Sequence, residues 1–152
     1  MIRKATISSE GLYRYKLYRK WKDDMTRTIL WVMLNPSTAD DKLEDATIRR
    51  CIGFSDSWGY GALYVGNLNA YRSTNPKHLL PPSVDEALLN TGHILDMMEQ
   101  SDLIVCAWGT MGLRKPPAFL GKELYVLGLT AEGYPKHPLR LRGDTPLAKW
   151  VF

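Results

Sequence analysis

The feature that most constrains the fold is an uninterrupted apolar run, Ile29-Leu30-Trp31-Val32-Met33-Leu34, which stops at Asn35-Pro36. A strand with one face in water alternates apolar and polar residues, so a continuous run predicts a strand covered on both faces. Further strand-like runs follow at residues 63–65, 103–108 and 124–127. The chain is therefore expected to fold as an α/β protein.

Helical patterns separate these runs. Residues 45–58 place apolar side chains at helical spacing behind Asp45, a good N-cap, and Ser83 with Glu86 forms the capping box of a second helix. Lys115-Pro116-Pro117 is expected to open a short helix, and Thr145-Pro146 a last one. The inner stripe expected for the second helix consists of Val84, Ala87, Leu88, Thr91, Leu95 and Met98.

Strands that alternate with helices predict a doubly wound, mostly parallel sheet. At the N-terminus, residues 13–22 mostly alternate apolar or aromatic with basic residues, which is typical of a half-buried antiparallel strand, and residues 23–26 can turn the chain. We therefore expect one domain over residues 1–152, with an N-terminal β-hairpin at one edge of the sheet. The basic residues of this strand, expected in solvent, are Arg14, Lys16, Lys20 and Lys22.

Composition narrows the function classes. The first ten residues lack the apolar region of a signal peptide, and no apolar run approaches the roughly 18 residues of a membrane helix. Two isolated cysteines and three dispersed histidines favour neither a disulfide framework nor a metal site. We expect a cytoplasmic monomer without a metal or cofactor. The net charge of +4 is a mild indication of a polyanionic partner.

Polar residues follow each apolar run. They are Asn35-Pro36-Ser37, Asn67, Trp108-Gly109 and His137-Pro138. In doubly wound sheets the active site lies beyond the carboxyl ends of the strands. Each motif alone is an ordinary turn or loop, but their order along the chain favours a shared site.

These segments resemble, in order, the motifs of the uracil-DNA glycosylase superfamily. Asn35-Pro36 is similar to the first motif in its mismatch-specific branch, Asn67 ends the next strand, Trp108-Gly109 resembles a later Leu-Trp-Gly, and His137-Pro138 the final motif. The whole pattern looks even more like a bacterial and phage family of unknown function, family 1643, which has been grouped with the glycosylases by fold. The resemblance implies a three-layer α/β/α fold with a mostly parallel central sheet.

The resemblance also implies a reaction, hydrolysis of the N-glycosidic bond of a base flipped out of DNA. Asn35 would position the attacking water, His137 would donate a hydrogen bond to the departing base, and Asn67 would read the base edge. Stacking on the base would fall to Phe54, with Trp58 or Tyr60 as alternatives, although helical spacing favours Trp58 as a core residue. The implied base-binding residues are Asn67, Pro36, Ser37, Phe54 and Trp108.

The loop after His137 would contact DNA. Leu141, or alternatively Leu139, would fill the gap that the flipped base leaves. Arg49 and Arg50 either hold a phosphate or lie exposed on the helix. The implied DNA-binding residues are Lys136, Leu139, Arg140, Leu141, Arg142, Arg49 and Arg50.

Departures from the superfamily motifs widen the choice of base. Met33 replaces a glycine, Asn35 replaces the aspartate of the uracil-specific branch, and Ser37 stands where that branch has a thymine-excluding tyrosine. A uracil-like, mismatched or modified base is therefore expected, in DNA repair or phage defence. No lysine occupies a lyase position, which predicts a monofunctional enzyme. The alternatives are a non-catalytic binding module of the same fold and an N-glycosidase of free nucleosides or nucleotides.

Overall fold

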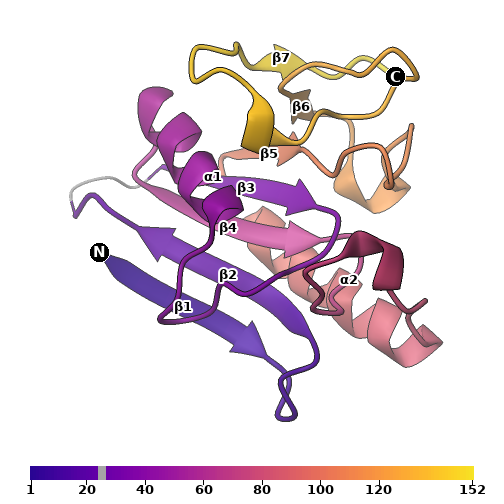
Figure 1. Ribbon diagram of the computed structural model, residues 1–152. Helices are drawn as coiled ribbons and strands as arrows, with labels where there is room; N and C mark the ends of the chain where they lie inside the picture. Colours follow the sequence, from indigo (N-terminus) through magenta and orange to yellow (C-terminus); the bar gives the residue numbers. More distant parts are fainter. Residues whose placement is uncertain (24–26) are drawn as a thin grey trace.

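A seven-stranded mixed sheet forms the centre of the computed structural model, which describes residues 1–23 and 27–152 (Figure 1). The strand order is β1-β2-β4-β3-β5-β6-β7. The strands are β1 (Ile2–Ile7), β2 (Arg14–Lys20), β3 (Thr28–Met33), β4 (Ala62–Asn67), β5 (Leu103–Cys106), β6 (Tyr125–Val126) and β7 (Ala148–Lys149).

The middle of the sheet is parallel and its edges are antiparallel. β3 pairs in parallel with both β4 and β5, and β5 pairs in parallel with β6. β2 is antiparallel to β4 and to β1, and β7 is antiparallel to β6. The carboxyl ends of β3, β4 and β5 therefore lie at the same edge of the sheet.

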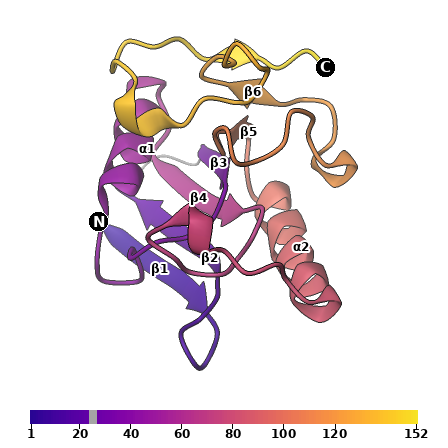
Figure 2. The ribbon, with the colours of Figure 1, turned by 45° about the vertical axis from the view of Figure 1, so that its right-hand side comes forward.

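Two α-helices pack on the sheet, α1 (Ala46–Ser57) and α2 (Val84–Glu99). Every residue of β3 is buried, which confirms the strand predicted from its apolar run. Its side chains alternate between two clusters: Ile29 and Trp31 pack in the cluster that contains α1, while Leu30 and Val32 pack in the one that contains α2. The two helices thus cover opposite faces of the sheet (Figures 1 and 2).

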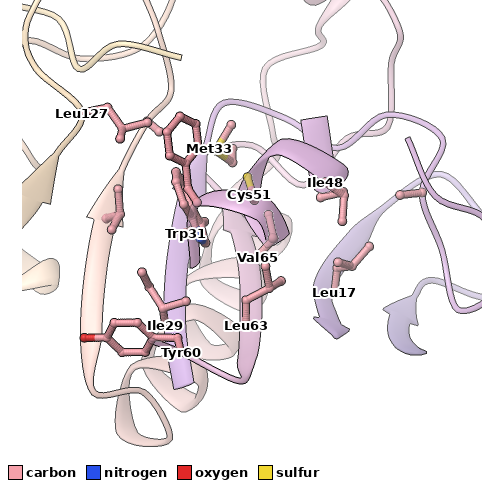
Figure 3. Packing of buried hydrophobic residues seen from close by; sticks show 14 residues of the cluster. Leu17, Ile29, Trp31, Met33, Ile48, Cys51, Tyr60, Leu63, Val65 and Leu127 are labelled. Carbon is pink, nitrogen blue, oxygen red and sulfur yellow. The ribbon is translucent and has the colours of Figure 1, made fainter. Parts of the chain in front are cut away.

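The α1 cluster fills the space between that helix and the sheet (Figure 3). The Trp31 ring stacks on Trp58 with ring centroids 5.8 Å apart, and the Trp31 Nε1 donates to Ser55 Oγ at 2.9 Å. Asp45 caps α1 as predicted, because its Oδ1 accepts from the Ile48 amide at 2.9 Å. The described residues also contain short 3-10 turns: η1 (Pro76–His78), η2 (Ala118–Leu120), which follows the predicted proline pair, and η3 (Pro138–Arg140).

An antiparallel hairpin forms the N-terminal edge, as expected, but it consists of β1 and β2. β2 does not turn back onto β3, because β4 lies between them. Of the predicted turn at 23–26, residues 24–26 lie outside the described part of the chain. The expectation that Arg14 is in solvent was wrong: the residue is 2% exposed.

The predicted inner stripe of α2 was wrong in large part. Val84, Ala87, Leu88 and Leu95 are exposed, whereas Thr91 and Met98 are half-buried and Met98 packs against the core. The fully buried residues are Asn90, Ile94 and Met97. Gly66 of β4 explains the choice of face. A Cβ on this glycine would lie 2.8 Å from Met97 Cε and 3.3 Å from Ile94 Cγ1, so the missing side chain makes room for these two residues.

The predicted last helix is absent from the described residues at the C-terminus. Thr145 begins a loop that leads into β7, which pairs with β6, and Trp150 is buried against Trp108. Burial of Trp150 and edge pairing hold the segment instead.

Both cysteines are buried and free. Desolvation raises the pKa of the Cys106 thiol to about 12 and raises that of Cys51 as well, mainly by burial. Among the described residues, no helix is both long enough and apolar enough to cross a membrane.

Candidate functional site

A cleft of about 610 Å³ opens at the carboxyl ends of β3, β4 and β5. Asn35, Asn67, Trp108 and His137, one from each of the four sequence motifs, all line it. The chain brings them together because β3, β4 and β5 run in parallel and end at one edge, and the loop 135–137 bonds back to this edge through Gly109. The convergence expected from the strand-end positions is therefore present in the structure.

The Asn35 side chain is held by its amide nitrogen. Nδ2 donates to the Ser73 carbonyl at 2.9 Å and to the Pro36 carbonyl at 3.0 Å. Both amide hydrogens are therefore used, and two carbonyl acceptors fix the orientation of the group. Within the described part of the chain, Oδ1 accepts no hydrogen bond, so it remains an acceptor at the wall of the cleft.

The Asn67 side chain is 1% exposed, and neither its Nδ2 nor its Oδ1 has a partner among the described residues. Its backbone is secured: the carbonyl accepts from Asn90 Nδ2 at 2.8 Å. Buried side-chain amides without partners are rare in folded proteins, because the lost hydration is not replaced. This amide lines the cleft, where a ligand could supply both missing bonds.

His137 is fixed in one tautomer when neutral. Its Nδ1 accepts from the Leu139 amide at 3.2 Å, so the ring proton is on Nε2. Burial lowers the pKa of His137 below its ordinary value of 6.5, opposed by the negative charge of Asp45. At neutral pH the residue therefore presents an uncharged N–H donor.

Trp108 is among the residues that line the cleft, but it is 1% exposed and its ring packs in the cluster that contains α2. Its Nε1 donates to the Leu113 carbonyl at 2.7 Å, and its ring meets Trp150 edge to face. Gly112 lies directly against this ring, since a Cβ there would be 2.0 Å from Trp108 Cδ1. Because its single side-chain donor is already bonded, Trp108 has no hydrogen bond to offer a ligand.

Two of the predicted base-binding residues, Pro36 and Phe54, do not line the cleft, whereas Ser37 does. Pro36 is buried behind Asn35, and its carbonyl accepts from Asn35 Nδ2. Phe54 does not reach the cleft: it packs in the core against Trp31 and Trp58. Tyr60 is likewise a core residue.

The two leucines of the loop around η3 differ in position. Leu139 is 42% exposed and lines the cleft, whereas Leu141 is half-buried against the α1 cluster and lines an adjoining cavity. Arg50 explains this arrangement. Its guanidinium donates to the Pro138 and Leu141 carbonyls and lies 4.9 Å from the Phe54 ring centroid, so it braces the loop from α1.

The remaining predicted DNA contacts surround the same loop. Arg140 is exposed at the rim of the cleft, and Lys136 lines an adjoining cavity of about 450 Å³. Arg142 is exposed and pairs with Asp144 at 3.1 Å. Arg49 is exposed on α1 and lines neither cavity.

Sequence reasoning did not assign several of the lining residues to the site, among them Arg14, Asp45 and Thr47. Asp45 was expected only as a helix cap, and both of its oxygens do accept backbone amides, from Ile48 at 2.9 Å and Ala39 at 3.3 Å. For Arg14 the available signal was its place at the start of an alternating strand, next to a turn. That signal does not distinguish a cation in solvent from one turned inward.

Arginines hold the segment between β3 and α1, which carries Asn35 and Asp45. Arg14 Nη1 donates to the Ala39 carbonyl at 3.0 Å, and Arg72 donates to the carbonyls of Ser37, Thr38 and Gly11. Arg19 pairs with Glu44 at 3.0 Å and donates to the carbonyl of Asp40. The segment is thereby rigid although it contains no helix or strand.

The described residues contain no group of three or more His, Cys, Asp or Glu side chains that could hold a metal. Fold and site together define an α/β protein with a polar cleft at the carboxyl ends of its central strands. The chain belongs to the family described as protein of unknown function (DUF1643), whose model matches residues 14–139. No curated protein and no solved structure matches it.

Proposed function

We propose that the protein is a monofunctional DNA glycosylase that hydrolyses the N-glycosidic bond of a uracil-like, mismatched or modified base flipped into the cleft. One observation carries the proposal: the cleft places the buried, unpartnered amide of Asn67 together with the fixed N–H donor of His137. An amide that offers a donor and an acceptor can read a base edge, and a neutral imidazole can stabilise a departing base.

The proposed reaction adds one water across the bond between the base nitrogen and the sugar C1′. As that bond breaks, its electron pair goes to the base, and His137 Nε2–H donates to the base oxygen that gains negative charge. Asn35 Oδ1 accepts a hydrogen bond from the water, whose oxygen bonds to C1′. One of the water's protons stays on the new C1′ hydroxyl, and the other passes through solvent to the released base. Asn35 orients the water but is not a strong base, which predicts a slow enzyme.

In the proposed complex with DNA, Leu139 fills the gap left by the flipped base. Leu139 is the exposed leucine of this loop, and Arg140 beside it would meet a phosphate. We further propose that the sheet with its two covering helices has the three-layer α/β/α architecture of the uracil-DNA glycosylases. The collinear strand-end motifs support this relationship.

The proposal is tested by single-turnover cleavage of single-stranded and duplex DNAs that carry uracil, mismatched thymine, hypoxanthine, or hydroxymethylated or glucosylated pyrimidines. Alkali reveals the abasic sites. We expect release of at least one base, with the rate reduced about 10²-fold or more in His137→Ala, and a large loss in Asn35→Ala. His78→Ala, which changes a histidine outside the cleft, is the matched control and should retain the rate.

Leu139→Ala should slow release from duplex DNA more than from single strands, while Leu95→Ala, an exposed leucine on α2, should not. If no base is released from any substrate while DNA still binds, the protein is instead a binding module of this fold. If only free nucleosides or nucleotides are cleaved, and Leu139→Ala has no effect, it is a nucleoside or nucleotide N-glycosidase.

A further inference from the structure

Arg14 places a buried cation at the cleft. The residue is 2% exposed and lines the cleft beside Asp45 and Asn67. Its Nη1 bonds the Ala39 carbonyl, but its Nε is buried and has no partner among the described residues. No carboxylate of the described part of the chain lies within 4.0 Å of its guanidinium nitrogens.

The charge of Arg14 is poorly compensated by the protein. Burial lowers the pKa of its guanidinium to about 10, so the group is strained by desolvation but remains charged at neutral pH. Asp45 contributes the nearest opposing charge, yet both of its oxygens are bonded to backbone amides. A buried charge without a hydrogen-bonded counter-ion is costly, and such a group in a cleft is a candidate for a binding residue.

Two neighbouring arginines show what a purely structural role requires. Arg19 is fully buried too, but it pairs with Glu44 and donates to three carbonyls. Arg72 braces the same segment as Arg14 from outside the cleft, with three carbonyl partners. The Arg14 guanidinium makes one such bond to a carbonyl, so most of its N–H donors remain available to a ligand.

We propose that Arg14 binds an anionic oxygen of the ligand inside the cleft, next to the amide of Asn67. The oxygen comes either from the phosphate of a nucleotide or from a carboxylate substituent on the base; in both cases a planar guanidinium can bind it through two N–H groups. This inference rests on the proposed function only in taking the cleft as the base pocket.

The test is calorimetric binding of four probes to the full chain: uridine, uridine 5′-monophosphate, 5-carboxyuridine and inorganic phosphate. We expect either uridine 5′-monophosphate or 5-carboxyuridine to bind at least tenfold more tightly than uridine. Preference for the monophosphate, with weak binding of phosphate itself, identifies a nucleotide phosphate; preference for 5-carboxyuridine identifies a base substituent.

Variants assign the preference to Arg14. Arg14→Gln should bind the anionic probe no better than uridine, and Arg14→Lys, which keeps the charge but loses the planar fork, should retain part of the preference. Arg72→Gln loosens the same segment without removing the cation from the cleft, so it should keep the full ratio. Thermal unfolding of each variant identifies any that fails to fold. If Arg14→Gln does not fold, a reduced preference for the anionic probe in Arg14→Lys tests the inference.

Equal binding of neutral and anionic probes, or no binding of any probe at millimolar concentration, would overturn the inference. So would a preference that survives in Arg14→Gln or disappears in Arg72→Gln. The proposed function fails separately. Base release from DNA with an unchanged preference in Arg14→Gln would support the glycosylase and refute the anion site, whereas an Arg14-dependent preference without base release would do the reverse.

Discussion

Two buried asparagines, Asn67 at the end of β4 and Asn90 on α2, differ in how far their amides are bonded. Asn90 Nδ2 donates to the backbone carbonyl of Asn67 and only its Oδ1 lacks a partner, whereas neither Nδ2 nor Oδ1 of Asn67 has a partner in the described chain. Replacing an unsatisfied polar group by an apolar one of similar shape is neutral or stabilising. We therefore expect Asn67→Leu to leave the free energy of unfolding within about 1 kcal/mol of the original or to raise it, while base release is lost. Urea denaturation measures the first effect and single-turnover cleavage the second.

Asn90→Leu is the matched control. It removes a made hydrogen bond, so it should lower the free energy of unfolding by about 1–3 kcal/mol. A loss of that size in Asn67→Leu as well would mean that the Asn67 amide is satisfied in solution and is not reserved for a ligand.

The pH response of His137 follows from its burial. The pKa of His137 is lowered from its ordinary value of 6.5, so the unfolded chain takes up this proton more readily than the folded protein. The stability contributed by this group is intact above about pH 6.5 and falls as the pH drops through the lowered folded-state pKa. NMR titration of the ring should give a midpoint below 6.5, and Asp45→Asn, which removes the opposing negative charge, should lower it further. A midpoint at or above 6.5 would contradict the buried, neutral donor.

At the residue level, the sequence predicted those residues of the candidate site whose position follows from the order of strands and loops. Asn35, Asn67 and His137 follow apolar runs or lie in the last loop, so the rule about strand ends was enough to find them. Phe54 and Arg14 could not be assigned in this way. Helical spacing does not say whether a ring faces the core or a cleft, and a basic residue in an alternating strand is normally exposed.

Among the elements, the loop after β5 depends on a glycine. A Cβ on Gly112 would lie 2.0 Å from Trp108, whose ring is held by the Leu113 carbonyl and by Trp150. Gly112→Ala should therefore destabilise the protein by about 1–3 kcal/mol through overpacking. Gly53 is the matched control: it is exposed inside α1, with nothing within 4 Å of an added Cβ.

We expect Gly53→Ala to raise the free energy of unfolding by about 0.5–1 kcal/mol, because alanine favours the helix. Thermal and urea unfolding of both variants measure the contrast. If the two substitutions have the same sign, the loop after β5 is free to move away from Trp108 and does not hold it.

The elements show why the sequence predicted α2 but not its buried face. Ser83 is confirmed as the N-cap that begins the helix, because its Oγ accepts from the Glu86 amide; the Glu86 carboxylate accepts from the Tyr15 hydroxyl. Two apolar stripes compete on the same helix, and the choice between them depends on Gly66, a residue of a different element. The missing C-terminal helix has a similar origin, because Trp150 is buried by contacts that are distant in sequence.

Viewed as a whole molecule, the protein carries a net charge of +4, and basic residues cluster near the cleft around η3. Binding to DNA releases counter-ions, so the affinity should fall linearly with salt on a log–log plot, by a slope of about −0.9 per phosphate contact. Arg140→Ala, at the rim of the cleft, should reduce that slope by about 1. The measurement is fluorescence anisotropy of a labelled duplex at about 50–200 mM salt. Over this range the affinity falls about 10³–10⁵-fold for a protein that makes roughly six to ten phosphate contacts.

Arg3→Ala is the control for that experiment, since Arg3 lies on the edge strand β1 and outside the cleft. An equal change of slope in both variants would show that the charge acts through the whole surface and not through the loop. No salt dependence at all would contradict a DNA partner.

The overall arrangement could be predicted in part. The apolar runs established an α/β protein with a mainly parallel centre, because a strand without polar residues must be covered twice. They could not give the strand order. β2 lies next to β4 and not next to β3, since its partner is chosen by side chains such as Leu17 and Val65 that meet only in the folded sheet.

The burial of both thiols has a practical consequence for studying this molecule. Cys51 and Cys106 are enclosed and their pKa values are raised, so maleimides and disulfide reagents should find no reactive sulfur in the native protein and two after denaturation. A single cysteine introduced by Leu139→Cys would then be the only site that accepts a fluorophore. The native chain thus already provides a background free of reactive thiols, on which a reporter at the rim of the cleft can follow ligand entry in real time.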